Sequence, residues 1–120
     1  MNSAKNKAIF LDRDGVIIEN QANYVRDWSQ AKFIPRAIGA IANLHRKNLY
    51  KIVIVTNQSA IGRRLISFKV AQDINKRLVK IIENHGGQIE GIYMCPHKPE
   101  DLCGCRKPKP GLFFQAAKDC

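Results

Sequence analysis

The chain has 120 residues, of which 20 are Lys or Arg and 10 are Asp or Glu, giving a formal net charge of +10. Hydrophobic residues make up 45% of the chain, enough for one small core, and no apolar run is long enough to cross a membrane. The basic residues are scattered, which argues against nucleic-acid binding and is compatible with a small anionic substrate. The polar residues 1–7 do not resemble a signal peptide, so we expect a cytoplasmic protein. We also expect a monomer.

Three apolar runs predict the strands of a parallel sheet covered on both faces. They span residues 7–11, 51–55 and, more weakly, 89–94. Between them lie two helical patterns: one after Pro35 (37, 38, 41, 44), and one capped by Ser67 (70, 74, 78, 81 or 82). A last apolar segment follows Pro110. The alternation predicts one α/β domain over residues 1–120, with a right-handed doubly wound sheet.

Two carboxylates follow the first predicted strand, in the run Asp12-Arg13-Asp14-Gly15. Two close carboxylates repel unless a cation relieves them, and magnesium prefers oxygen ligands. With the metal bound, one aspartate can attack phosphorus while the other moves a proton. A turn in which Asp caps the next segment is the alternative interpretation.

The second predicted strand ends in Thr56-Asn57-Gln58-Ser59. A hydroxyl and backbone amides at a strand end can hold phosphate oxygens. Taken alone, this run is more typical of a helix cap and turn.

A cluster of soft ligands predicts a structural zinc site. Cys95, His97, Cys103 and Cys105 lie within eleven residues and offer a closed tetrahedral set. Reduced thiols in a loop are the alternative. Cys120 has no evident partner.

A basic run begins directly after the last cysteine of this cluster. Arg106 and Lys107 open the run Arg-Lys-Pro-Lys-Pro-Gly, and such cations suit a phosphorylated substrate. A solvated basic loop is the alternative.

Together these motifs resemble the haloacid dehalogenase (HAD) superfamily. Within it they are most similar to the D-glycero-D-manno-heptose 1,7-bisphosphate 7-phosphatase family, with the histidinol-phosphatase family as a close relative. The resemblance implies a HAD-like doubly wound, Rossmannoid sheet with a zinc-binding loop. It also implies Mg²⁺-dependent hydrolysis of a small phosphorylated sugar through a phospho-aspartate, in the synthesis of the lipopolysaccharide core heptose.

The resemblance further implies a role for each matching residue. Asp12 would be the nucleophile and Asp14 the general acid and base, and both would ligate magnesium. Cys95, His97, Cys103 and Cys105 would bind zinc. The residues implied in binding substrate or phosphate are Arg13, Asn20, Asn23, Tyr24, Thr56, Asn57, Gln58, Ser59, Arg106 and Lys107.

Some features depart from the family pattern. Ala60 and Arg64 stand where glycines are common, and an alanine is tolerated there only at negative φ. The family continues into a further strand and a Gly-Asp-x-x-x-Asp-type magnesium motif beyond Cys120, so we expect the fold to be incomplete at its C-terminal side. Two alternatives stay open: hydrolysis of histidinol phosphate, and a truncated, non-catalytic zinc-binding fragment. A nucleic-acid-binding zinc module would not need Asp12 and Asp14.

Overall fold

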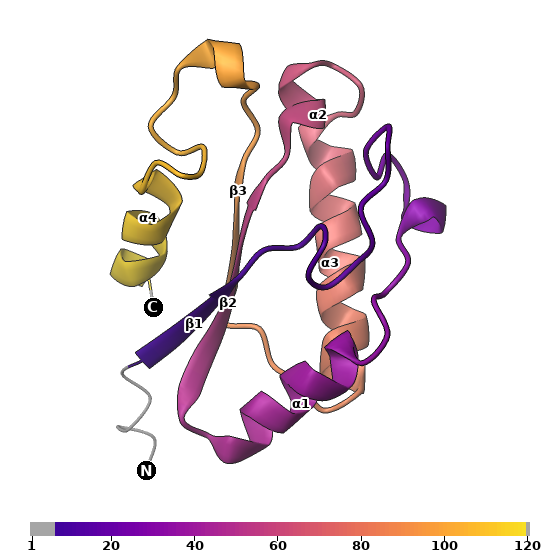
Figure 1. The fold of residues 1–120 in the computed structure, drawn as a ribbon, viewed down its shortest axis with the longest axis vertical. Coiled ribbons are helices and arrows are strands. Elements are labelled where there is room, and N and C mark those ends of the chain that lie inside the picture. Colours follow the sequence, from indigo (N-terminus) through magenta and orange to yellow (C-terminus); the bar gives the residue numbers. More distant parts are fainter. Residues whose placement is uncertain (1–6, 120) are drawn as a thin grey trace.

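The computed structural model describes residues 7–119, so the polar residues 1–6 and Cys120 lie outside the described part of the chain. Its centre is a parallel sheet of three strands in the order β1-β2-β3 (Figure 1). The strands are β1 (Lys7–Leu11), β2 (Tyr50–Asn57) and β3 (Gly91–Cys95). All three strands lie where the apolar runs predict them. The bounds of β1 are as predicted, and the ends of β2 and β3 differ by one or two residues.

Helices cover both faces of the sheet, because the side chains of β2 alternate between two apolar clusters. Ile52 and Ile54 pack with α1 (Ala37–Lys47) and α3 (Phe68–Asn84). Val53 and Val55 point to the other face and pack with α4 (Gly111–Asp119). Figure 1 shows α4 on one side of the sheet and α1 and α3 on the other. The predicted α/β arrangement with two covered faces is thereby confirmed.

Three short helical turns complete the described chain. They are a 3₁₀ turn at Trp28–Gln30, a one-turn helix α2 at Ser59–Gly62 and a 3₁₀ turn at Pro99–Asp101. Within residues 7–119, no helix has the length and apolar character needed to cross a bilayer.

The buried face of α3 differs from the predicted stripe at its first position. Ser67 caps the helix as expected, since its Oγ accepts a hydrogen bond from Val70 N at 3.1 Å. Val70 itself is 40% exposed, and the residues buried near this end are Ala71, Ile74 and Asn75. Adjacent residues on a helix point about 100° apart, so the stripe that begins at Ala71 leaves Val70 on the solvent side. The prediction that Val70 is buried was therefore wrong.

We expect Leu78→Ala to lower the free energy of unfolding by about 2–5 kcal/mol, because it opens a cavity in the fully buried face of α3. Val70→Ala, on the same helix, should change it by less than about 0.5 kcal/mol. Urea denaturation of the two variants measures both values. Equal losses would contradict this assignment of the buried face.

Candidate active site

The register of the sheet brings the ends of the three strands to one edge. Leu11, the last residue of β1, lies opposite Ile54, and Asn57, the last residue of β2, lies opposite Cys95. The residues that follow β1, β2 and β3 therefore lie near one another, which is where parallel α/β sheets bind their ligands.

A cleft of about 270 Å³ opens at this edge. A sharp turn brings the chain back over it: Gly15 has φ +85°, and a Cβ there would lie only 2.7 Å from Asn20 Nδ2. Asn23, expected in the substrate loop, is exposed and is not among the residues that line the cleft. The lining residues are Asp12, Asp14, Asn20, Gln21, Tyr24, Val25, Asn57 and Gln58.

Asp12 lies beside a lysine that comes from the far end of the chain. Its Oδ2 is 2.9 Å from Lys107 Nζ, and its Oδ1 accepts a hydrogen bond from Arg13 N at 2.8 Å. Lys107 Nζ also donates to Val55 O at 2.8 Å. Asn57 holds the backbone of Lys107 by two hydrogen bonds, accepting from its N–H at 2.9 Å and donating to its carbonyl at 3.2 Å. The ammonium group is thus fixed against the carboxylate.

Asp14 is held by a buried arginine. Arg13 is 1% exposed, and its Nε and Nη2 each lie 3.2 Å from one oxygen of the Asp14 carboxylate. Nη2 also donates to Gln58 Oε1 at 2.8 Å, and Nη1 donates to Asn75 Oδ1 at 2.9 Å. These bonds direct the guanidinium to protein side chains, and a contact of Arg13 with substrate stays a prediction.

Thr56 and Ser59 are buried next to this network. Thr56 Oγ1 accepts a hydrogen bond from Gln58 Nε2 at 2.7 Å, and Gln58 Nε2 also reaches Asp14 Oδ2 at 3.2 Å. Ser59 begins α2. The motif at residues 56–59 is therefore joined to the aspartate motif through the Gln58 side chain.

Two arginines lie near Tyr24, which lines the cleft. A hydrogen bond with the Ser59 side chain lowers the pKa of Tyr24, partial desolvation opposes this, and the charges of Arg63 and Arg106 lower it further. Tyr24 has φ +68°, which an ordinary residue rarely adopts. The sequence prediction missed Arg63 and Gln21. Only their places, beside the motif at 56–59 and inside the loop at 20–24, could have suggested them.

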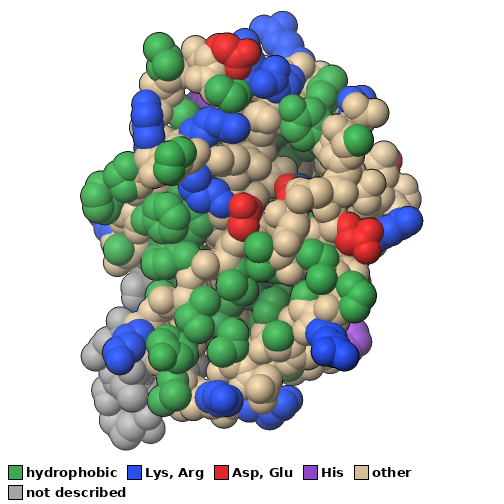
Figure 2. All heavy atoms as spheres, viewed as in Figure 1, with side chains coloured by type: hydrophobic (Ala, Val, Ile, Leu, Met, Phe, Trp, Pro, Cys, Tyr) green, Lys and Arg blue, Asp and Glu red, His purple; other side chains and the backbone are tan. Residues whose placement is uncertain are grey.

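Basic side chains surround this end of the molecule. Figure 2 shows several Lys and Arg side chains over the upper part, where the loop after β3 and α2 lie in Figure 1, and others along the lower edge. Such a field attracts anionic ligands.

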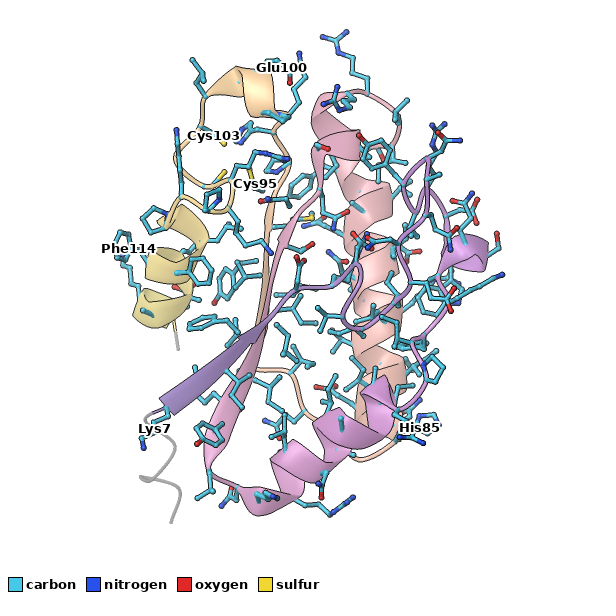
Figure 3. All side chains as sticks on the ribbon, in the orientation of Figure 1. Lys7, His85, Cys95, Glu100, Cys103 and Phe114 are labelled. Carbon is cyan, nitrogen blue, oxygen red and sulfur yellow. The ribbon has the colours of Figure 1, made fainter. Side chains whose placement is uncertain are left out.

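Four side chains of the loop after β3 come together as a possible metal centre. The ligand atoms of Cys95, His97, Cys103 and Cys105 all lie within 4.8 Å of one another. Sulfur separations run from 2.9 Å for Cys105–Cys95 to 3.6 Å for Cys105–Cys103. Tetrahedral zinc with Zn–S bonds of about 2.3 Å separates its sulfurs by roughly 3.8 Å, so the group is close to the size of a zinc site. Figure 3 shows Cys95 and Cys103 on the two arms of the loop.

The shifted pKa values of the thiols also suit a bound cation. Burial and the neighbouring Cys105 raise the pKa of Cys95 to about 12. Desolvation alone would raise the pKa of Cys103, but hydrogen bonds from Cys95 and from the Arg106 backbone lower it to about 6. Crowded thiols resist ionising together, and a divalent metal removes this conflict.

The loop packs closely on α2 at Gly62. A Cβ on Gly62 would lie 2.8 Å from the backbone N of Lys98 and from Pro96 O.

The two departures from the family pattern are both accommodated. Ala60 lies inside α2 with helical φ, whereas Arg64 adopts φ +62°, the left-handed conformation that a glycine adopts easily.

The motifs and this geometry agree with the comparison to known families. The sequence model of Polynucleotide kinase 3 phosphatase matches residues 7–120. The chain belongs to this HAD-like phosphatase family. The resemblance to HAD phosphatases inferred from the motifs is thereby confirmed.

Curated relatives agree on one kind of enzyme. The chain is 41% identical over 116 residues to the D-glycero-beta-D-manno-heptose-1,7-bisphosphate 7-phosphatase of Helicobacter pylori, covering 95% of this chain and 65% of the relative. It is 42% identical over 107 residues to the corresponding alpha-heptose enzyme of Mycobacterium tuberculosis, covering 88% of this chain and 56% of the relative. The chain therefore spans less than two thirds of the length of these relatives.

A solved structure has the same fold. The D,D-heptose 1,7-bisphosphate phosphatase from B. bronchiseptica, complexed with magnesium and phosphate, superposes with a TM-score of 0.87 at 35% identity. The match covers 93% of this chain and 62% of that one.

We expect Cys103→Ser to reduce bound zinc well below the roughly one ion per chain of a closed four-ligand site, and to lower the melting temperature. Elemental analysis of the purified protein and a thermal scan measure the two effects. Cys120→Ser, outside the described residues, is the control and should keep its zinc. Full zinc content in Cys103→Ser would contradict the ligand assignment.

Proposed function

We propose that this chain carries the catalytic aspartates of a magnesium-dependent phosphatase that releases the 7-phosphate of D-glycero-D-manno-heptose 1,7-bisphosphate. One observation carries the proposal: Asp12 Oδ2 lies 2.9 Å from Lys107 Nζ in a cleft that Asp14 also lines. A carboxylate beside a fixed cation suits attack on a phosphoryl group, whose charge the cation stabilises.

The proposed reaction has two steps. An oxygen of Asp12 bonds to phosphorus as the bond from phosphorus to the sugar oxygen breaks, and Asp14 gives its proton to that oxygen. Asp14 then takes a proton from a water molecule that attacks the phospho-aspartate, which releases inorganic phosphate and restores Asp12. Lys107 stays against the phosphoryl oxygens in both steps, and the buried hydroxyl of Thr56 lies at the end of the neighbouring strand.

Two metals fit the side chains present. Asp12 and Asp14 line one cleft and offer the oxygen donors that magnesium prefers. When bound there, magnesium would offset the negative charge of the carboxylates and the phosphoryl group. The Cys95, His97, Cys103 and Cys105 group leaves no ligand position for substrate, so zinc would fix the shape of the loop that carries Arg106 and Lys107.

The substrate contains a second phosphate, and the cleft mouth offers cations for it. The charges of Arg63 and Arg106 both lower the pKa of Tyr24, so both guanidinium groups lie near this side chain. An arginine can bind a phosphate through two parallel hydrogen bonds. Asn20, Asn57 and Gln58 line the cleft and suit sugar hydroxyls, and the relatives cited above support a heptose over histidinol. A monomer in the cytoplasm stays a prediction.

We expect Asp12→Asn to lower phosphate release from heptose 1,7-bisphosphate by roughly a thousandfold or more, because an amide oxygen is a poor nucleophile. The assay uses the whole chain with magnesium, both anomers of the bisphosphate, and histidinol phosphate for comparison.

Asp73→Asn is the matched control, since Asp73 lies on the exposed side of α3 and pairs with Arg77. It should keep the parent rate. Activity that survives Asp12→Asn would refute the nucleophile. A correctly folded parent chain that hydrolyses none of these substrates would refute the proposed function and favour a non-catalytic zinc-binding fragment.

A further inference from the structure

Asn75 is a polar residue in the middle of the apolar face of α3. It is 3% exposed, between Ala71 and Leu78, which are fully buried. Its Oδ1 accepts a hydrogen bond from Arg13 Nη1 at 2.9 Å, and its Nδ2 lies 3.5 Å from Met94 Sδ on β3. A buried amide requires such partners, and the bond to Arg13 is charge-assisted and therefore the stronger one.

Arg13 transmits this contact to the cleft. Its Nε and Nη2 bond to the two oxygens of Asp14, and a planar guanidinium bound in this way sets the plane of the carboxylate. The opposite end of the same rigid group, Nη1, is the end that Asn75 holds. The orientation of the Asp14 oxygens is therefore coupled to a side chain on α3.

We propose that Asn75 is a positioning residue for the phosphatase reaction: by holding Arg13 Nη1, it fixes the direction in which Asp14 exchanges its proton. This inference rests on the proposed function. Asn75 acts through Arg13, since it is not among the residues that line the cleft of Asp12 and Asp14. It borders instead a separate hollow of about 550 Å³ between α3 and β3.

If Asn75 positions Asp14 in this way, loss of its side-chain amide should have a specific kinetic effect. Asn75→Leu keeps a similar size but leaves Arg13 Nη1 without this acceptor in a buried place. The guanidinium can then turn, and Asp14 turns with it. Substrate binding depends on other side chains, such as Arg106 and Lys107, so the turnover step is affected and binding is not.

The kinetic test compares three variants of the whole chain with magnesium and heptose 1,7-bisphosphate. Asn75→Leu should lower kcat roughly 10- to 100-fold and leave KM within about twofold of the parent, as expected for a misplaced catalytic group. Asn75→Asp returns an oxygen acceptor to Arg13 and should recover most of kcat. Gln72→Leu, an amide that borders the same hollow from the preceding turn of α3, is the control and should match the parent.

Three results would overturn the inference. They are a raised KM with unchanged kcat in Asn75→Leu, equal loss of kcat in Asn75→Asp and Asn75→Leu when both are folded, or an equal loss in Gln72→Leu. If Asn75→Leu does not fold, Asn75→Ser takes its place with the same expectations, because its shorter side chain does not reach Nη1.

A second measurement does not depend on activity. The Nε–H of Arg13 bonds directly to Asp14, so its exchange with solvent in ¹⁵N-labelled protein reports how firmly Asp14 is held. Exchange should be at least about tenfold faster in Asn75→Leu than in the parent, and should return toward the parent in Asn75→Asp. Unchanged exchange would refute the coupling. A parent chain without activity would refute the proposed function alone, and this exchange test would still decide the link between Asn75 and Asp14.

Discussion

The site depends on the parallel pairing of β2 with a strand on each side. Because all three strands run the same way, they end at one edge, and the register sets Asn57 opposite Cys95 while β1 ends opposite the middle of β2. The aspartates after β1, the polar run after β2 and the cysteine loop after β3 have no other reason to meet. A one-residue slip of either neighbour would turn its side chains to the other face and separate these groups.

The two carboxylates in the cleft are held by different kinds of cation. Asp12 faces Lys107, which is partly exposed and carries a compact ammonium group. Asp14 faces Arg13, which is buried and rigidly bound by Gln58 and Asn75. A compact charge suits the phosphoryl group that Asp12 would attack, whereas a group that would move a proton benefits from a fixed direction.

Much of this arrangement could be predicted from local sequence. Apolar runs predicted the strands because a sheet covered on both faces needs them, and the spacing of Cys95, His97, Cys103 and Cys105 predicted their cluster because a short loop cannot separate them far. Contacts between distant elements could not be predicted in this way. Asn75 interrupts the apolar stripe of α3, but the reason for a polar residue there is its hydrogen bond with Arg13, which lies 62 residues earlier. The exposure of Val70 depends on a rotation of the helix that periodicity alone does not set.

The two hydrogen bonds between the Asn57 side chain and the Lys107 backbone have a consequence for the entropy of the site. They join residues 50 positions apart, so the ammonium group reaches Asp12 only after a long stretch of chain has lost its freedom. Pro96, Pro99 and the closely packed Gly62 restrict that stretch before the last contact forms. The position of one charge in the cleft is thus determined largely by the stiffness of the loop that carries it.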